Sequence, residues 1–380
     1  MDLSELIFTS FGPILYNLIF IVLWLLWIDF HYKKDESKAR NILKTYLEKD
    51  SHFYLVTGLS IALFLFLLFS YAIFNTDVDD AITSGVEAFL KGYNPYQDNV
   101  VVHHLPEPMG ITLGLYHYFP SDLLSYSLFY ILGGELFVPI LGTYWFMPYH
   151  LLLLLPGYWL TYNIVSWPHR RLLPFYLLLL TPFLFTNSML MWFFFMIGYY
   201  CYEEKGYHNI GMIFYVLAAS VKYLVGFIIV FYFFRTISSI YQQRQNSLSF
   251  KSIVSKLSPY ISGSFVLTII SLPFGLIDVI VAVFLYQGDP AYRDDVAQSV
   301  GPFLIEILTV FQLNALYLLC VAIILIIALF VIRNHSTYEK IIHISFLAMF
   351  ILPFYGTELF ITLPFYWWFK EVLNMYPLRK

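Results

Sequence analysis

Three carboxylates stand close together where the chain leaves a long apolar stretch. Asp77, Asp79 and Asp80 directly follow that stretch, which ends near residue 75. A carboxylate at the edge of a hydrocarbon layer is partly desolvated, and desolvation raises its pKa, as a general base requires. A single Asp at such a place is also a common solvated loop charge or helix cap. The position of the cluster favours base chemistry, with Asp77 as first candidate, Asp80 second and Asp79 third.

Metal chemistry is the alternative for the same residues. Asp77-Val78-Asp79 has the Asp-x-Asp spacing of some metal sites, but this spacing is too common to carry weight. The two cysteines, Cys201 and Cys320, both lie in apolar stretches, where packing is their ordinary role. We therefore expect no metal site and no cofactor.

Cationic groups that could hold a phosphate are few. The candidates are Lys222, Arg293, His103 and His104. Lys222 falls within an apolar stretch, where an unpaired ammonium costs about 2.5–3.5 kcal/mol, so we expect it to face a polar cavity or a carboxylate. Arg293 can instead pair with the aspartates that follow it, and the two histidines can be ordinary loop residues.

Composition determines the class of protein. Of the 380 residues, 59% are hydrophobic and 12% are charged, about half the ~25% charged residues of a soluble domain. Apolar stretches of eighteen or more residues recur along the chain, which is the signal of membrane-spanning helices. No basic stretch is interleaved with aromatic residues, so a nucleic-acid partner is excluded. The sequence predicts an all-α, polytopic transmembrane helix bundle in the cell membrane, with the lipid bilayer as its partner.

Lysine and arginine set the expected orientation. Residues 31–52 hold six of them and residues 235–258 hold four, so both segments should be cytoplasmic. Residues 75–108 and 286–301 are acidic and should face outward. We expect one transmembrane domain over residues 1–380, with the N-terminus outside and the C-terminus inside.

About eleven spans are expected. They are placed at residues 8–30, 53–75, 109–132, 136–165, 172–186, 188–202, 209–234, 259–286, 302–332, 340–355 and 357–373. This count puts Arg170 and Arg171 outside, against the charge rule, and a broken segment between residues 109 and 202 would remove the conflict.

The first outer loop, residues 76–108, carries the candidate active site. An amphipathic helix is expected over residues 81–91, capped by Asp79 or Asp80 and closed by Gly92 before the Asn94-Pro95 turn. Such a helix would lie in the membrane interface. In the C-terminal part, Glu358 follows an outer turn and is a candidate for binding a sugar or an acceptor.

These segments resemble a known family. Asp77 with its neighbours, the stretch Gly92-Tyr93-Asn94-Pro95-Tyr96 and the stretch Tyr118-Phe119-Pro120 together resemble the first-loop pattern of the glycosyltransferase C superfamily. The nearest pattern is that of glycosyltransferase family 87, the polyprenol-phosphate-mannose-dependent mannosyltransferases. Residues 181–235, with Asn187, the turn Glu203-Glu204-Lys205-Gly206 and Lys222, are also similar to that family.

The resemblance implies a membrane hexosyltransferase with its active site on the non-cytoplasmic face. Such an enzyme transfers a hexose, with mannose favoured, from a polyprenyl-phosphate sugar to a lipid- or glycan-linked acceptor, with inversion and without a metal. An aspartate would act as the base. The matched positions Tyr96 and Asn187 would then bind substrate, together with Lys222.

Two other classes compete with this interpretation. A multi-pass transporter or flippase-like protein should carry ionisable residues on several helices and repeated halves, and no repeat is evident in this chain. A structural or assembly protein would have no need of an acidic outer loop with a rigid turn. The pattern favours the transferase.

Overall fold

The computed structural model describes residues 45, 49–69, 77–104, 111–165, 169–222, 225–244 and 249–286. Helices make up 83% of the interpretable residues, which confirms a mainly α-helical protein. A two-stranded sheet is present as well, and the sequence did not predict it. The chain forms two compact units, one of residues 1–65, 165–179 and 293–380 and the other of residues 66–164 and 180–292.

The first unit is described by α4 (Asp50–Phe69), the 3-10 helix η6 (His169–Leu172) and α9 (Leu173–Leu180). Arg171 forms an ion pair with Asp50, and its guanidinium carbon lies 5.6 Å from the centroid of the Phe53 ring. The pair holds Arg171 at the beginning of α4. It puts Arg171 on the same side as Asp50, which is contrary to the expected placement of Arg171 outside and Asp50 inside.

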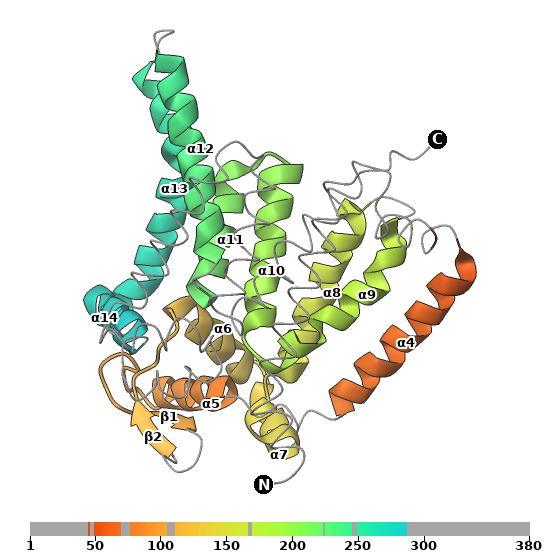
Figure 1. Ribbon diagram of the computed structural model, residues 1–380. Coiled ribbons are helices and arrows are strands. Elements are labelled where there is room, and N and C mark those ends of the chain that lie inside the picture. Colours follow the sequence, from red (N-terminus) through yellow and green to blue (C-terminus); the bar gives the residue numbers. More distant parts are fainter. Residues whose placement is uncertain are drawn as a thin grey trace, which may run out of the picture. The chain divides into compact units, whose positions relative to one another are not determined.

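The second unit begins with α5 (Asp77–Leu90), which is joined by the antiparallel strands β1 (Val101–His104) and β2 (Ile111–Gly114). Figure 1 shows both strands beside α5. The helix begins four residues before the expected 81–91, because the acidic residues themselves open it. The expected span 109–132 is wrong in its first half, where β2 forms, and a helix follows only from Pro120.

A bent segment follows β2. It consists of α6 (Pro120–Ile131), η4 (Gly134–Phe137), α7 (Val138–Leu141) and η5 (Gly142–Tyr144), and α8 (Met147–Ile164) comes next. Gly133 and Gly142 adopt φ values of 128° and 58° at the breaks, a region that favours glycine. The helices on either side of Gly133 differ in direction by 77°. The expected single span 136–165 is also divided, because η4, α7 and η5 end at Tyr144 and α8 begins at Met147.

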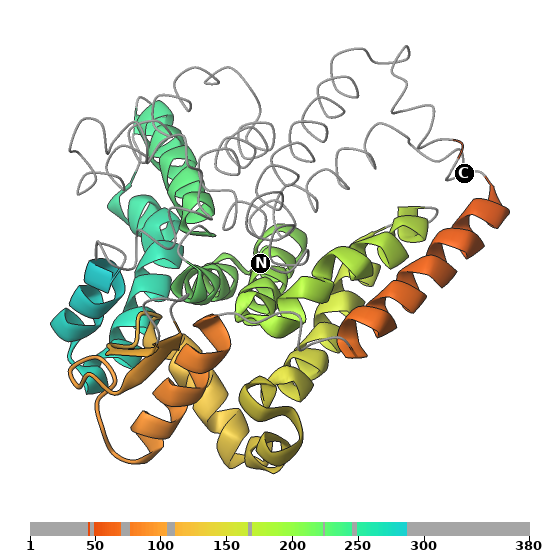
Figure 2. The ribbon, with the colours of Figure 1, turned by 60° about the horizontal axis from the view of Figure 1, so that its bottom comes forward.

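The remaining helices form the larger part of this unit. They are η7 (Thr181–Phe185), α10 (Ser188–Tyr199), the π-helical turn η8 (Tyr200–Glu204), α11 (His208–Val221), α12 (Gly226–Arg244), α13 (Phe250–Ser271), η10 (Leu272–Phe274) and α14 (Leu276–Tyr286). In Figure 2, α11 lies near α10 and α13, in agreement with their contacts. The expected span 209–234 is divided, because α11 ends at Val221 and α12 begins at Gly226.

Few helices in the described residues are long and apolar enough to cross a membrane. Phe250–Phe274 is long and apolar enough to cross a membrane, and Pro120–Ile131 with Gly134–Tyr144 would qualify only as one broken span. The count of eleven spans stays a prediction. The expected spans 8–30, 302–332, 340–355 and 357–373 lie outside the described residues.

Two glycines bring α10 and α11 into close contact. A methyl group on Gly198 would stand 3.1 Å from the Gly211 carbonyl oxygen, and one on Gly211 would stand 2.7 Å from the Tyr202 backbone nitrogen. Small residues at such a contact allow backbones to approach, as they do between helices in membranes.

Gly211→Ala should destabilise the protein by about 1–3 kcal/mol, because the added methyl overlaps backbone that cannot rotate away. Gly58→Ala in α4 is the matched control, since a methyl there meets no atom within 4 Å. Alanine in an open helical position should leave stability unchanged or raise it by about 0.5–1 kcal/mol. Denaturant unfolding in detergent micelles measures both, and equal stability of the two variants would contradict the close contact.

Candidate functional site

A fully buried carboxylate, Asp122, lies in the first turn of α6. The Tyr116 hydroxyl donates a hydrogen bond to Asp122 Oδ2, and Asn187 Nδ2 donates one to Oδ1 at 3.3 Å. Pro120 opens the helix and suits its first position, while a carboxylate in the first turn is favoured by the helix dipole. The three side chains come from segments as far as 71 residues apart in sequence and form the centre of a polar cluster.

Lys222 joins this cluster from the end of α11. Its side chain is 6% exposed, and it ends the helix in an extended conformation with φ −136° and ψ 106°. Its ammonium nitrogen lies 5.9 Å from the centroid of the Tyr118 ring and acts electrostatically on Asp122. A buried ammonium group needs a nearby negative or polar group to offset the free energy lost when it leaves water. Lys222 therefore stands at a helix break beside a carboxylate and not in the middle of a continuous helix.

Two buried histidines complete the cluster. The His103 ring, on β1, lies 5.2 Å from the His117 ring, which belongs to the extended segment before α6. Burial lowers the pKa of His117 well below its usual value, and the nearby His103 and Lys222 lower it further. His117 is thus held as a neutral imidazole. His104 is the last residue of β1, and the partner of His103 is His117.

The Gly92–Tyr96 turn is tied to the same cluster. The Asn94 side-chain oxygen accepts from the Tyr96 amide at 3.1 Å, and the Asp98 carboxylate accepts from the Asn94 amide at 2.9 Å. The Tyr96 hydroxyl donates to the Tyr118 carbonyl at 2.8 Å. Burial raises the pKa of Tyr96 well above its usual value, and Asp122 adds to this, so the hydroxyl stays a donor.

A second bond joins the same two segments, because the Tyr116 amide donates to the Pro95 carbonyl at 2.7 Å. The first-loop turn and the stretch before α6 are thereby held side by side. These are the two stretches that carry the family resemblance. The structure brings them together around Asp122.

Helix α5 packs against the cluster through Gly85. A methyl group at Gly85 would stand 2.5 Å from the Tyr116 ring, so only glycine permits this contact. Asp77 is the first residue of the helix. Its distance along α5 from Gly85 is about 12 Å, from the helical rise of 1.5 Å per residue.

Asp79 and Asp80 are buried in the first turn of α5. Asp79 accepts a hydrogen bond from the Thr143 hydroxyl at 2.6 Å, and Trp145 donates to Thr83 one turn further along. The expectation that Asp79 or Asp80 caps a helix at 81–91 is wrong, since both lie inside the helix. Asp79 instead joins α5 to the bend at η5.

The predicted site residues in the described part of the chain lie mainly in two regions. Lys222, His103, Asn187 and Tyr96 all lie in the buried cluster, and Asp77, Asp79 and Asp80 lie in the first turn of α5. Arg293 and Glu358 lie outside the described residues. Within the described residues, no three His, Cys, Asp or Glu side chains are arranged to share a metal ion.

Sequence reasoning missed Asp122 and its donor Tyr116. A signal was present, because Asp122 is an ionisable residue inside an apolar stretch, and such residues are costly unless they are paired. The same argument that singled out Lys222 applies to Asp122. Lys222, 100 positions further along the chain, acts electrostatically on Asp122.

Comparison with known proteins adds no relative: no protein-family description, no curated protein and no solved structure matches this chain.

A double-mutant cycle tests the buried pair. Asp122→Asn and Lys222→Met should be strongly non-additive in unfolding free energy, by about 1 kcal/mol or more, because each single change leaves a buried charge without its counterpart. The exposed pair Glu87–Lys91, 3.0 Å apart on α5, is the matched control. Its cycle with Glu87→Gln and Lys91→Met should give about 0.3–0.5 kcal/mol. A buried coupling no larger than the exposed one would contradict the assignment.

Proposed function

We propose that this protein is a membrane-embedded hexosyltransferase of the glycosyltransferase C type. It would take a hexose, mannose in the favoured case, from a polyprenyl-phosphate donor and transfer it with inversion to a lipid- or glycan-linked acceptor. The reaction would take place on the non-cytoplasmic face of the cell membrane. The bundle of about eleven spans belongs to this proposal.

The observation that carries the proposal is the convergence of distant motifs on one buried cluster. The turn Gly92–Tyr96, the stretch Tyr116–Pro120, Asn187 and Lys222 are separated along the chain, yet their side chains or backbones meet around Asp122. Residues that served only to pack separate helices would not need to lie together in one cluster. Of these positions, Gly92–Tyr96, Tyr118–Pro120, Asn187 and Lys222 carry the resemblance to polyprenyl-phosphate-sugar transferases.

The chemistry needs a base and a group that stabilises the departing lipid phosphate. The base removes the proton from the acceptor hydroxyl as its oxygen attacks the anomeric carbon, and the bond from that carbon to the phosphate oxygen breaks. Lys222 would compensate the charge that develops on the phosphate. Asn187 Oδ1 is buried and accepts no hydrogen bond among the described residues, so it is available to a sugar hydroxyl.

Asp77 remains the proposed base, with Asp80 second. The other buried carboxylates already accept hydrogen bonds, since Asp79 accepts from Thr143 and Asp122 accepts from Tyr116 and Asn187. Asp77 opens α5, at the point where the chain leaves the expected span.

A transporter or flippase-like protein is the second candidate. The buried Asp122–Lys222 pair and the helix breaks at residues 132–144 and 222–225 are features that transporters also show. The experiments below separate the two, because a transporter would not consume a lipid-phosphate sugar.

Asp77→Asn should abolish sugar transfer, by the ~10²–10⁴-fold typical of general-base loss, while the protein stays folded. The assay supplies polyprenyl-phosphate mannose and, in parallel, polyprenyl-phosphate glucose to the purified protein and measures release of polyprenyl phosphate. Glu87→Gln is the control, an exposed carboxylate on the same helix that should leave the rate unchanged. Asp79→Asn and Asp80→Asn complete the set, and activity in all three aspartate variants would sink the transferase proposal.

Lys222→Met should raise the KM for the lipid-phosphate donor by about tenfold or more, because it removes a charge-assisted contact to phosphate. Lys222→Arg keeps the positive charge and should recover much of the donor affinity. A normal donor KM in the Met variant would show that Lys222 serves only to neutralise Asp122.

A further inference from the structure

A second polar site lies at the other end of the α10–α11 pair. An open cavity of about 910 Å³ is lined by η8, the start of α11, α12 and α13. The buried cluster around Asp122 lies near Asn187 and Lys222, where α10 begins and α11 ends, whereas the cavity lies where α10 continues into η8 and α11 begins. The 14-residue α11 separates the two by about 20 Å. The cavity is therefore a different site.

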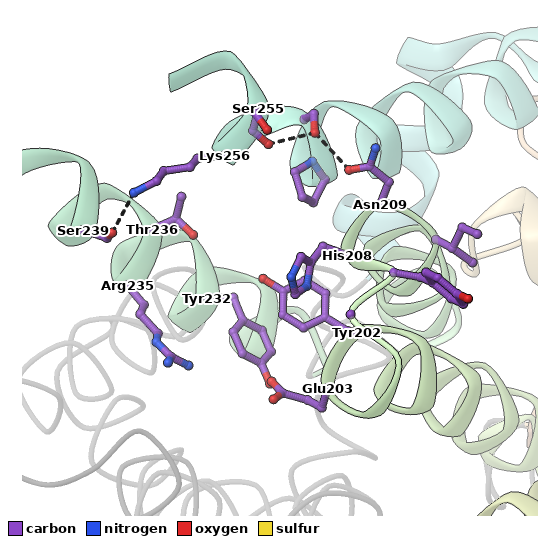
Figure 3. A pocket seen from close by; sticks show the side chains of 15 residues that line it. Tyr202, Glu203, His208, Asn209, Tyr232, Arg235, Thr236, Ser239, Ser255 and Lys256 are labelled. Atoms are coloured by element: carbon purple, nitrogen blue, oxygen red, sulfur yellow. Dashed lines mark hydrogen bonds between the residues drawn. The ribbon is translucent and has the colours of Figure 1, made fainter. Parts of the chain in front are cut away.

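Cationic and neutral donors dominate the lining. Figure 3 shows Thr236 and Ser239 on α12 opposite Ser255 and Lys256 on α13, while the Arg235 side chain extends from α12 away from α13. The Lys256 ammonium donates to the Ser239 hydroxyl at 2.9 Å, and this bond joins the two helices. Arg235 is exposed at the same wall.

The one carboxylate in the lining is already engaged. Glu203 accepts a hydrogen bond from the Tyr232 hydroxyl. Two cationic side chains thus stand against one acid that is held at a wall, and the lining keeps a positive balance. This balance favours an anionic ligand.

The start of α11 contributes further donors. His208, Asn209 and Ile210 line the cavity and form the first turn of the helix, whose first backbone N–H groups have no partner within the helix. The cap residue Tyr207 makes no side-chain capping bond. Anions, phosphate above all, bind at such helix starts when cations stand nearby.

Hydrogen bonds between the lining helices hold the walls of the cavity in place without a ligand. The Ser258 hydroxyl bonds to Asn209 Oδ1 at 3.0 Å and links α13 to α11, while the Thr236 and Tyr260 hydroxyls are 2.9 Å apart and link α12 to α13. Polar side chains that are fixed in this way lose little entropy when a ligand binds.

We propose that this cavity binds a phosphate group, with Arg235 and Lys256 as its cationic contacts and the first turn of α11 as its backbone contact. The expected cytoplasmic position of residues 235–258 and the exposed apolar residues Phe234, Ile237 and Val254 on the same two helices favour the headgroup of an anionic phospholipid as the source. A soluble phosphate ester presents the same group. The site is independent of the transferase proposal.

Binding to the full-length protein in neutral detergent tests the site. One arm titrates inorganic phosphate by calorimetry, and the other counts bound phosphatidylglycerol against phosphatidylcholine by native mass spectrometry. Preferential phosphatidylglycerol binding that needs Arg235 and Lys256 identifies a lipid headgroup, and binding of phosphate alone identifies a soluble ester. Absence of both would overturn the proposal.

The double variant Arg235→Gln/Lys256→Gln should weaken binding by about tenfold or more, since two charge-assisted contacts are lost. Lys91→Gln/Lys251→Gln removes the same charge from residues that do not line the cavity, and it should bind like the unmodified protein. Equal binding by both double variants would refute the site. Added sodium chloride gives a test without any variant, because it should weaken binding of the phosphate probe through screening. Binding that is indifferent to salt would count against the proposal.

Discussion

The burial of one carboxylate organises the second unit. Moving an ionised group out of water costs several kcal/mol unless partners replace the lost hydration. Asp122 is fully buried, and its partners are Tyr116, Asn187 and Lys222. The stretch before α6, the start of α10 and the end of α11 must therefore meet at one point. The first-loop turn follows, because Pro95 and Tyr96 are bonded to the residues beside Tyr116.

The helices that meet there are held in place by small residues. Gly85 lets α5 lie against the Tyr116 ring, while Gly198 and Gly211 let α10 approach the neighbouring helix closely. A side chain at Gly85 would displace Tyr116, which donates to Asp122, and hydrogen bonds weaken steeply with distance and angle. The close contact at Gly85 and the hydrogen bonds of the buried polar groups thus depend on each other. The polar cluster therefore constrains how the helices pack as well as which charges can be buried.

The sequence allowed the helical class, the amphipathic first-loop helix and the need of Lys222 for a polar neighbour to be predicted. These follow from composition, from periodicity and from the cost of a buried charge, which are local properties. It did not allow β2, the start of α5 at Asp77 or the bend near Gly133 to be predicted. Hydropathy averages over a window and hides a strand or a glycine break inside an apolar stretch. The pairing of Asp122 with Lys222 was missed because it depends on how two distant helix ends meet.

The hydrogen bonds that the buried carboxylates already accept affect which carboxylate can act as a general base. Asp122 is fully buried, and each of its two carboxylate oxygens already accepts a hydrogen bond, one from Tyr116 and one from Asn187. Asp79 is similarly occupied by Thr143. A general base needs an accessible lone pair within hydrogen-bond reach of the proton it removes. Asp122 is thus suited to hold the polar cluster together. In the proposed transferase the base would be a different carboxylate, Asp77 at the start of α5.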